Sequence, residues 1–146
     1  MKKDLIDMDK LYKINKKLFK YSSLLFIYLF MGSAVAQTLN SKQLSEVLIQ
    51  GANDIRKQSP MKFDGVTTLT GAMASSNNLV YYYRLNIAKN EISSGFERTQ
   101  KEFLGYNWCS AMQLLLSSGA KITGVYQDKN GIFIAKISVT KQDCNY

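Results

Sequence analysis

The chain contains no histidine, a single proline and only two cysteines among its 146 residues. The absence of histidine removes the commonest general base near neutral pH and the commonest metal ligand. Hydrolases whose serine or cysteine nucleophile depends on a histidine are therefore excluded. The two cysteines, Cys109 and Cys144, are far apart in the sequence, so the CxxC spacing of zinc and thiol redox sites is also missing.

Motifs for phosphates, nucleotides and metals are lacking as well. The glycines match neither a phosphate-binding loop nor a dinucleotide fingerprint. Residues 128–131 begin like a calcium loop, but the later acidic ligand is missing, so we interpret them as a turn. The sequence thus predicts no cofactor, no metal site and no catalytic residue, and we expect that the protein is not an enzyme.

A long apolar run occurs near the start of the chain. Residues 21–31 are mostly apolar, residues 16–20 before them carry three lysines, and small residues lead up to Ala36. This pattern predicts a signal peptide over residues 1–36 that is cleaved after Ala36. The alternative is a membrane anchor, but the run is shorter than the ~20 apolar residues needed to cross a bilayer. We therefore expect no stable membrane span after cleavage, whether translation starts at Met1 or Met8.

Residues 37–146 then form one domain, which is periplasmic or secreted. This part of the chain holds twelve lysines and arginines and eight aspartates and glutamates, scattered along its length. Because the basic residues form no cluster in the sequence, we expect no nucleic acid as a partner.

The pair of cysteines indicates a disulfide between Cys109 and Cys144, because an even count in an exported domain is typical of one. In the chain-entropy model, closing a loop of this length would stabilise the fold by roughly 4 kcal/mol. Two free thiols are the alternative that the residues alone leave open.

The order of predicted elements is helix, two strands, helix, two strands. Asn40 and Gln43 can form a capping box for the first helix, which Pro60 ends. The further expected elements are a hairpin of residues 65–70 and 79–87, a helical region over 93–119 with a weak point at Gly105, and a hairpin of residues 122–127 and 132–139. This order predicts an α+β domain with an antiparallel four-stranded sheet and two helices packed on one face.

Aromatic side chains supply the candidate binding residues. Alternation along residues 79–87 separates Tyr82 and Arg84 from the more apolar face of that strand. We expect Tyr81, Tyr83 and Trp108 in the core, and we take Tyr82, Arg84 and Tyr126 as candidate partner-binding residues.

Four local patterns in this order carry a resemblance to a known family. They are residues 60–64 leading into 66–69, residues 79–85, Cys109 with 115–119, and residues 126–131 with Cys144. They resemble small exported Gram-negative proteins that include the pilotins of the Vibrio-type type II secretion system and quorum-sensing-regulated virulence-factor proteins of pseudomonads. The resemblance implies a helix-bearing four- or five-stranded sheet, joined cysteines, and binding of a C-terminal segment of the secretin, which pilotins help to reach the outer membrane.

The chain departs from the family at the end of the signal. A pilotin normally begins, after cleavage, at a cysteine that carries acyl chains, whereas residues 32–37 contain no cysteine. We therefore predict a periplasmic or secreted, non-enzymatic binding protein of pilotin-like fold, without a lipid anchor, that recognises a peptide segment of a secretion or envelope component. The alternatives are a periplasmic inhibitor or immunity protein against a toxin or hydrolase, and a secreted virulence factor.

N-terminal sequencing tests the predicted signal peptide. We expect the protein recovered from the envelope or the culture medium to begin at Gln37, because the small residues before it suit signal peptidase. A recovered protein that still contains residues 16–36 would contradict the assignment.

Overall fold

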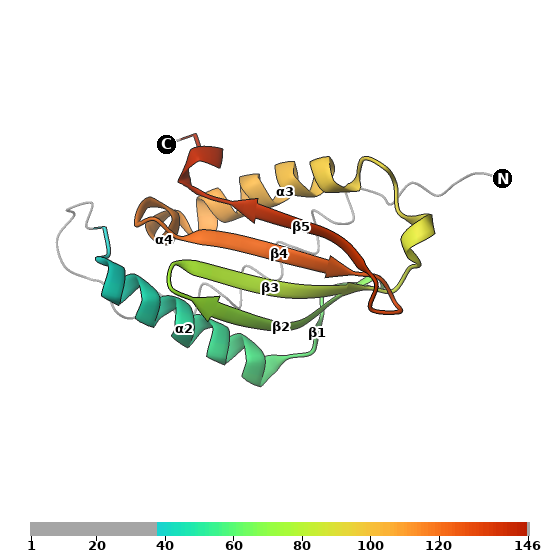
Figure 1. Cartoon of the computed structure of the whole chain (residues 1–146), viewed down its shortest axis with the longest axis horizontal. Coiled ribbons are helices and arrows are strands. Elements are labelled where there is room, and N and C mark those ends of the chain that lie inside the picture. The colour runs from blue at the N-terminus through green and yellow to red at the C-terminus, as the bar shows by residue number, and fades with distance from the viewer. Residues whose placement is uncertain (1–37, 146) are drawn as a thin grey trace. The chain divides into compact units, whose positions relative to one another are not determined.

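The computed structural model describes residues 38–145, and Figure 1 shows how their helices and strands are arranged. The predicted signal peptide and its cleavage site lie outside these residues. The α-helices are α2 (Ser41–Gln58), α3 (Phe96–Ala111) and α4 (Gln113–Ser117), and the strands are β1 (Met61–Lys62), β2 (Thr67–Ser75), β3 (Asn78–Leu85), β4 (Lys121–Gln127) and β5 (Phe133–Val139). A short 3-10 helix, η2 (Lys89–Glu91), lies between β3 and α3, and another, η3 (Lys141–Asp143), follows β5. None of the helices within residues 38–145 is long and apolar enough to cross a membrane.

The sheet has five strands in the order β1-β2-β3-β4-β5 and is mixed. The two expected hairpins are present, because β2 pairs with β3 and β4 with β5 in antiparallel fashion. The prediction of four antiparallel strands is wrong in two respects: β1 adds a fifth strand on β2, and β3 and β4 are parallel. Parallel pairing follows from the long crossover through α3 and α4, which brings the chain back to the end of the sheet where β3 began.

Helix α2 begins as the sequence predicts. The N–H of Gln43 donates to the Asn40 side chain at 3.0 Å, and the N–H of Asn40 donates to the Gln43 side chain at 3.1 Å. The expected weak point at Gly105 is wrong, since α3 continues through it and the helical region breaks at Met112 instead.

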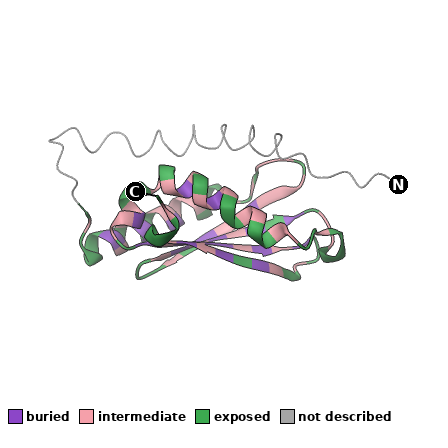
Figure 2. Cartoon of the chain, turned by 90° about the horizontal axis from the view of Figure 1, so that it is seen from above, coloured by how far each residue is buried: buried purple, intermediate pink, exposed green. Residues whose placement is uncertain are grey.

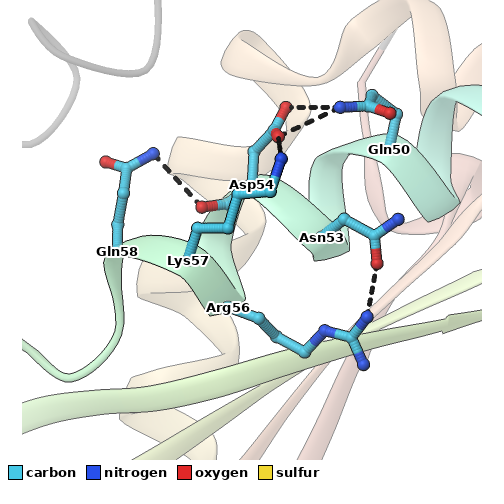
Figure 3. A network of polar contacts seen from close by, with 6 residues as sticks. All are labelled: Gln50, Asn53, Asp54, Arg56, Lys57 and Gln58. Carbon is cyan, nitrogen blue, oxygen red and sulfur yellow. Dashed lines mark hydrogen bonds and ion pairs between the residues drawn. The ribbon is translucent and has the colours of Figure 1, made fainter.

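The solvent side of α2 carries a polar network around Asp54 (Figure 3). Gln50 donates to both carboxylate oxygens of Asp54 at 3.0 Å, and the Lys57 ammonium lies 3.4 Å from the same carboxylate. Because Gln50 and Lys57 are exposed and lie only four and three residues from Asp54, we assign the network to local support of the helix.

All three helices pack on one face of the sheet, where α2 contacts β2 and β3, and α3 contacts β5 (Figure 1). Buried side chains from every helix and from strands β2 to β5 form one core cluster. Leu48 of α2, Leu116 of α4 and Ile122 of β4 are at most 1% exposed within it. The core therefore lies between the helices and this one face.

Aromatic rings link the strands to α3 inside the core. The rings of Tyr83 and Tyr126 are stacked with centroids 4.9 Å apart, and Phe96 of α3 meets Tyr126 edge-on at 5.4 Å. Tyr81 bridges to Trp108 at 5.8 Å. Tyr81, Tyr83 and Trp108 are at most 8% exposed, which confirms that they are core residues.

Because Gly124 of β4 has no side chain, the stacked rings of Tyr83 and Tyr126 can occupy the space next to its backbone. A Cβ atom there would lie 3.1 Å from the Tyr126 ring and 3.4 Å from the Tyr83 ring. Tyr126 is held between Tyr83 and Phe96, so it has little room to move away.

We expect the substitution Gly124→Ala to lower the free energy of unfolding by about 1 kcal/mol, because overpacking of this kind costs more than the added side chain gains. Gly71→Ala is the matched control, since no atom lies within 4 Å of a Cβ at that strand position. Chemical denaturation measures both variants. Equal stability of the two variants would contradict the role of Gly124.

The loop between β4 and β5 is built around Asp128, which is 1% exposed. Its carboxylate accepts hydrogen bonds from three backbone N–H groups, those of Asn130 at 2.8 Å, Ile132 at 2.8 Å and Lys89 at 3.2 Å. Burial of the carboxylate opposes its ionisation, but these donors and the nearby charge of Lys129 outweigh it and lower the pKa of Asp128. The turn expected at residues 128–131 is therefore confirmed, and it also ties the hairpin to the segment after β3.

We expect Asp128→Asn to destabilise the domain at neutral pH and to lose this effect in acid. A lowered folded-state pKa means that the ionised carboxylate stabilises the fold above its unfolded-state pKa of about 4, and that this contribution disappears as the pH falls through the folded-state value. Urea unfolding at pH 7 and at a series of acid pH values measures the difference from the parent. The exposed Glu46→Gln is the control. A destabilisation that is independent of pH would contradict the assignment.

Candidate partner-binding face

The second face of the sheet is not covered by any helix within residues 38–145. Figure 2 shows the described helices gathered on one side of the strands. Residues on this second face alternate with the core residues along β3, where Tyr81 and Tyr83 are buried, Tyr82 is partly exposed and Arg84 is exposed. We call this surface the open face.

An apolar stripe crosses the open face diagonally from β2 to β5. In the register of the sheet, Met73 lies opposite Val80 and Tyr82 lies opposite Val125. Phe133 is the first residue of β5 and lies opposite Gln127, two residues beyond Val125 on β4. Met73 and Phe133 are 56% and 52% exposed, which is high for large apolar side chains. The apolar stripe therefore consists of Met73, Val80, Tyr82, Val125 and Phe133.

Tyr82 is fixed at the centre of the stripe. Its hydroxyl donates to the Met73 sulfur at 3.4 Å, and its backbone carbonyl accepts a hydrogen bond from the Thr70 hydroxyl at 3.0 Å. Thr70 is the extra residue where the register of β2 and β3 shifts. Gly71 lies directly opposite Tyr82, and a Cβ atom there would have no other atom within 4 Å.

A polar cluster closes the end of the open face beyond the stripe. The hydroxyl of Thr123 donates to the Asn78 side-chain oxygen at 3.0 Å and lies 3.0 Å from the Ser138 hydroxyl. Thr123 is completely buried by its neighbours. Because these groups satisfy one another, the cluster supports the surface and offers little to a ligand.

Two of the three predicted binding residues are on the open face. Tyr82 and Arg84 point to the same side of β3, where Tyr82 is partly exposed and Arg84 is exposed. Tyr126 is not, because it is 4% exposed and is stacked on Tyr83 in the core. Burial raises the pKa of Tyr126, as it does for its neighbour Tyr83. The expectation that Tyr126 contacts a partner is therefore corrected.

Sequence reasoning missed the other members of the stripe. Val80 lies two residues before Tyr82 on β3, but Met73, Val125 and Phe133 come from three other strands, and only the register of the strands places them together. Alternation assigns Val80 and Val125 to this face, whereas Met73 and Phe133 lie on it because the register shifts at Thr70 and Ile134 interrupt the alternation of β2 and β5.

The predicted disulfide joins Cys109 of α3 to Cys144, with the two Cα atoms 5.5 Å apart. The Lys101 ammonium lies 3.0 Å from the carboxylate of Asp143, so a second contact holds the same segment on α3. Burial opposes ionisation of Asp143, but hydrogen bonds from Thr140 and Lys101 outweigh it and lower its pKa.

Among residues 38–145 no three acidic or cysteine side chains gather in a way that could hold a metal ion.

Comparison with solved structures gives three informative likenesses. A candidate secreted protein of Pseudomonas aeruginosa superimposes with a TM-score of 0.62 at 18% identity, over 78% of this chain and 100% of that one. The type II secretion system pilotin AspS of Vibrio cholerae gives 0.57 at 18%, over 71% and 94%. The pilotin EpsS of the Vibrio vulnificus type 2 secretion system gives 0.60 at 16%, over 73% and 96%.

The fold is pilotin-like. This likeness confirms the resemblance seen in the sequence at the level of the fold. No family model and no curated protein matches the chain.

Proposed function

We propose that the protein is an exported, non-enzymatic binding protein that recognises a peptide segment of a secretion or envelope component on its open face. Tyr82 and Arg84 are the contact residues that we assign from the sequence, and the rest of the apolar stripe joins them. Residues 37–146 form the working domain, located in the periplasm or outside the cell.

The observation that carries this proposal is the half-exposed apolar stripe on an otherwise well-packed sheet. An antiparallel or mixed sheet often leaves one face to solvent, but that face is then usually polar. Here Met73 and Phe133 are each more than half exposed, and an aromatic ring lies between them. Exposed large apolar side chains gathered in one place are typical of protein interaction sites.

The pilotin-like fold supports the choice of partner. Two of the similar structures are pilotins of type II secretion systems. The resemblance to pilotins implies binding of a segment of another protein, and a segment of that kind would cover the apolar stripe. The predicted lack of a lipidated cysteine distinguishes this protein from a pilotin that is anchored in a membrane, so we propose that it binds its partner without being attached there.

Site-specific photo-crosslinking in the native host tests the proposal. A photoreactive phenylalanine analogue replaces Tyr82 on the open face, and in a matched strain it replaces Tyr106, which is 74% exposed on α3. We expect the analogue at position 82 to capture one envelope or secretion protein that position 106 does not capture, because only the first lies on the apolar stripe. Mass spectrometry identifies the product.

Other crosslinked products would favour an alternative function or contradict the proposal. A captured toxin or hydrolase would favour the inhibitor or immunity alternative. The same products from both positions, or no product from position 82, would contradict binding on the open face.

A further inference from the structure

The net charge of the described domain is concentrated on its sheet. Residues 38–145 contain twelve lysines and arginines and eight aspartates and glutamates. Four of the basic residues, and none of the acidic ones, lie on strands. The remaining eight basic residues are matched in number by the eight acidic ones, so the surplus of positive charge belongs to the strands.

All four of these basic residues lie on the open face. Lys62 pairs with Thr68, and Arg84, Lys121 and Lys136 each follow or precede buried core residues on their strands. Lys62, Arg84 and Lys136 are exposed, and Lys121 is partly exposed. None of the four makes an ion pair with any residue between 38 and 145.

The four cations flank the apolar stripe on both sides. On one side of the stripe lie Lys62 and Arg84, near the end of β3 that pairs with the β1 side of β2. On the other side lie Lys121, at the start of β4, and Lys136 of β5, which pairs with Val125. From the usual spacings of a sheet, the Cα atoms of Arg84 and Lys136 are about 12 Å apart. That distance exceeds the Debye length of about 8 Å at physiological salt, so each flank presents its own positive field.

We infer that the segment bound on the open face is acidic and amphipathic, with an apolar side that is flanked by carboxylates on both edges. This inference rests on the proposed function, because it names the chemistry of the partner at that site. Carboxylates on the partner would neutralise Arg84 on one flank and Lys136 on the other, while its apolar side chains cover Met73, Tyr82 and Phe133. Such complementarity selects partners and their orientation more than it adds affinity.

A selection from a library of random 16-residue peptides, displayed on phage and panned on the protein produced from the full chain, tests the inference. We expect the selected peptides to combine apolar residues with an excess of aspartate and glutamate. Panning is repeated on the double variant Arg84→Gln, Lys136→Gln, and on the matched control Lys42→Gln, Arg98→Gln, which removes two exposed cations from the helices.

Binding of one selected acidic peptide is then measured by fluorescence anisotropy. We expect its Kd to rise roughly fivefold in the Arg84, Lys136 variant, since exposed ion pairs each contribute modestly. The Kd should stay within about a factor of two in the control variant, since its cations lie away from the stripe. Raising the salt concentration should weaken binding to the parent more than to the Arg84, Lys136 variant.

The outcomes separate this inference from the proposed function. Selected peptides whose binding depends on Tyr82 but which carry no excess of acidic residues would overturn the inference that the partner is acidic. They would leave the open face as a binding site. Peptides whose binding is unaffected by Tyr82→Ala, or no enrichment at all, would contradict both. Binding of phosphatidylglycerol vesicles that depends on Arg84 and Lys136, without any acidic preference among peptides, would assign the positive charge to a lipid surface and overturn the inference.

Discussion

Burial of a single face of the sheet is the constraint on which the rest of the domain depends. The apolar residues of β2 to β5 that point to this face form one cluster with Leu48 of α2, Trp108 of α3 and Leu116 of α4. A small domain has few other sources of stability, and this one adds a disulfide that fastens its last residues to α3. Because all three helices are used to cover this face, none is left within the described residues to cover the other, and the apolar stripe stays exposed there.

Much of this fold could be predicted from the sequence because its signals are local. The capping box at Asn40, the alternation along β3 and the turn at Asp128 each lie within a few residues, and each is found where it was expected. The parallel pairing of β3 and β4 could not be predicted in this way. It depends on how the crossover through α3 and α4 returns, and β1, with two residues, gives no periodic signal at all.

The candidate site was predicted only in part for the same reason. Tyr82 and Arg84 belong to one strand whose alternation assigns their face. Tyr126 was misplaced although it shares the core face of β4 with Ile122, because only the structure shows that Gly124 leaves room there for its ring. Met73, Val125 and Phe133 become neighbours of Tyr82 only through the register of four strands. A likeness to pilotins at 16% to 18% identity extends the fold assignment, while the chemistry of the open face belongs to this chain.

The parallel junction between β3 and β4 has a consequence for when the open face exists. Met73, Val80 and Tyr82 come from the first hairpin, and Val125 and Phe133 come from the second, which pairs with the first through β3 and β4. Neither hairpin alone displays the complete surface. A ligand that contacts the whole apolar stripe therefore requires both hairpins to be paired in one sheet.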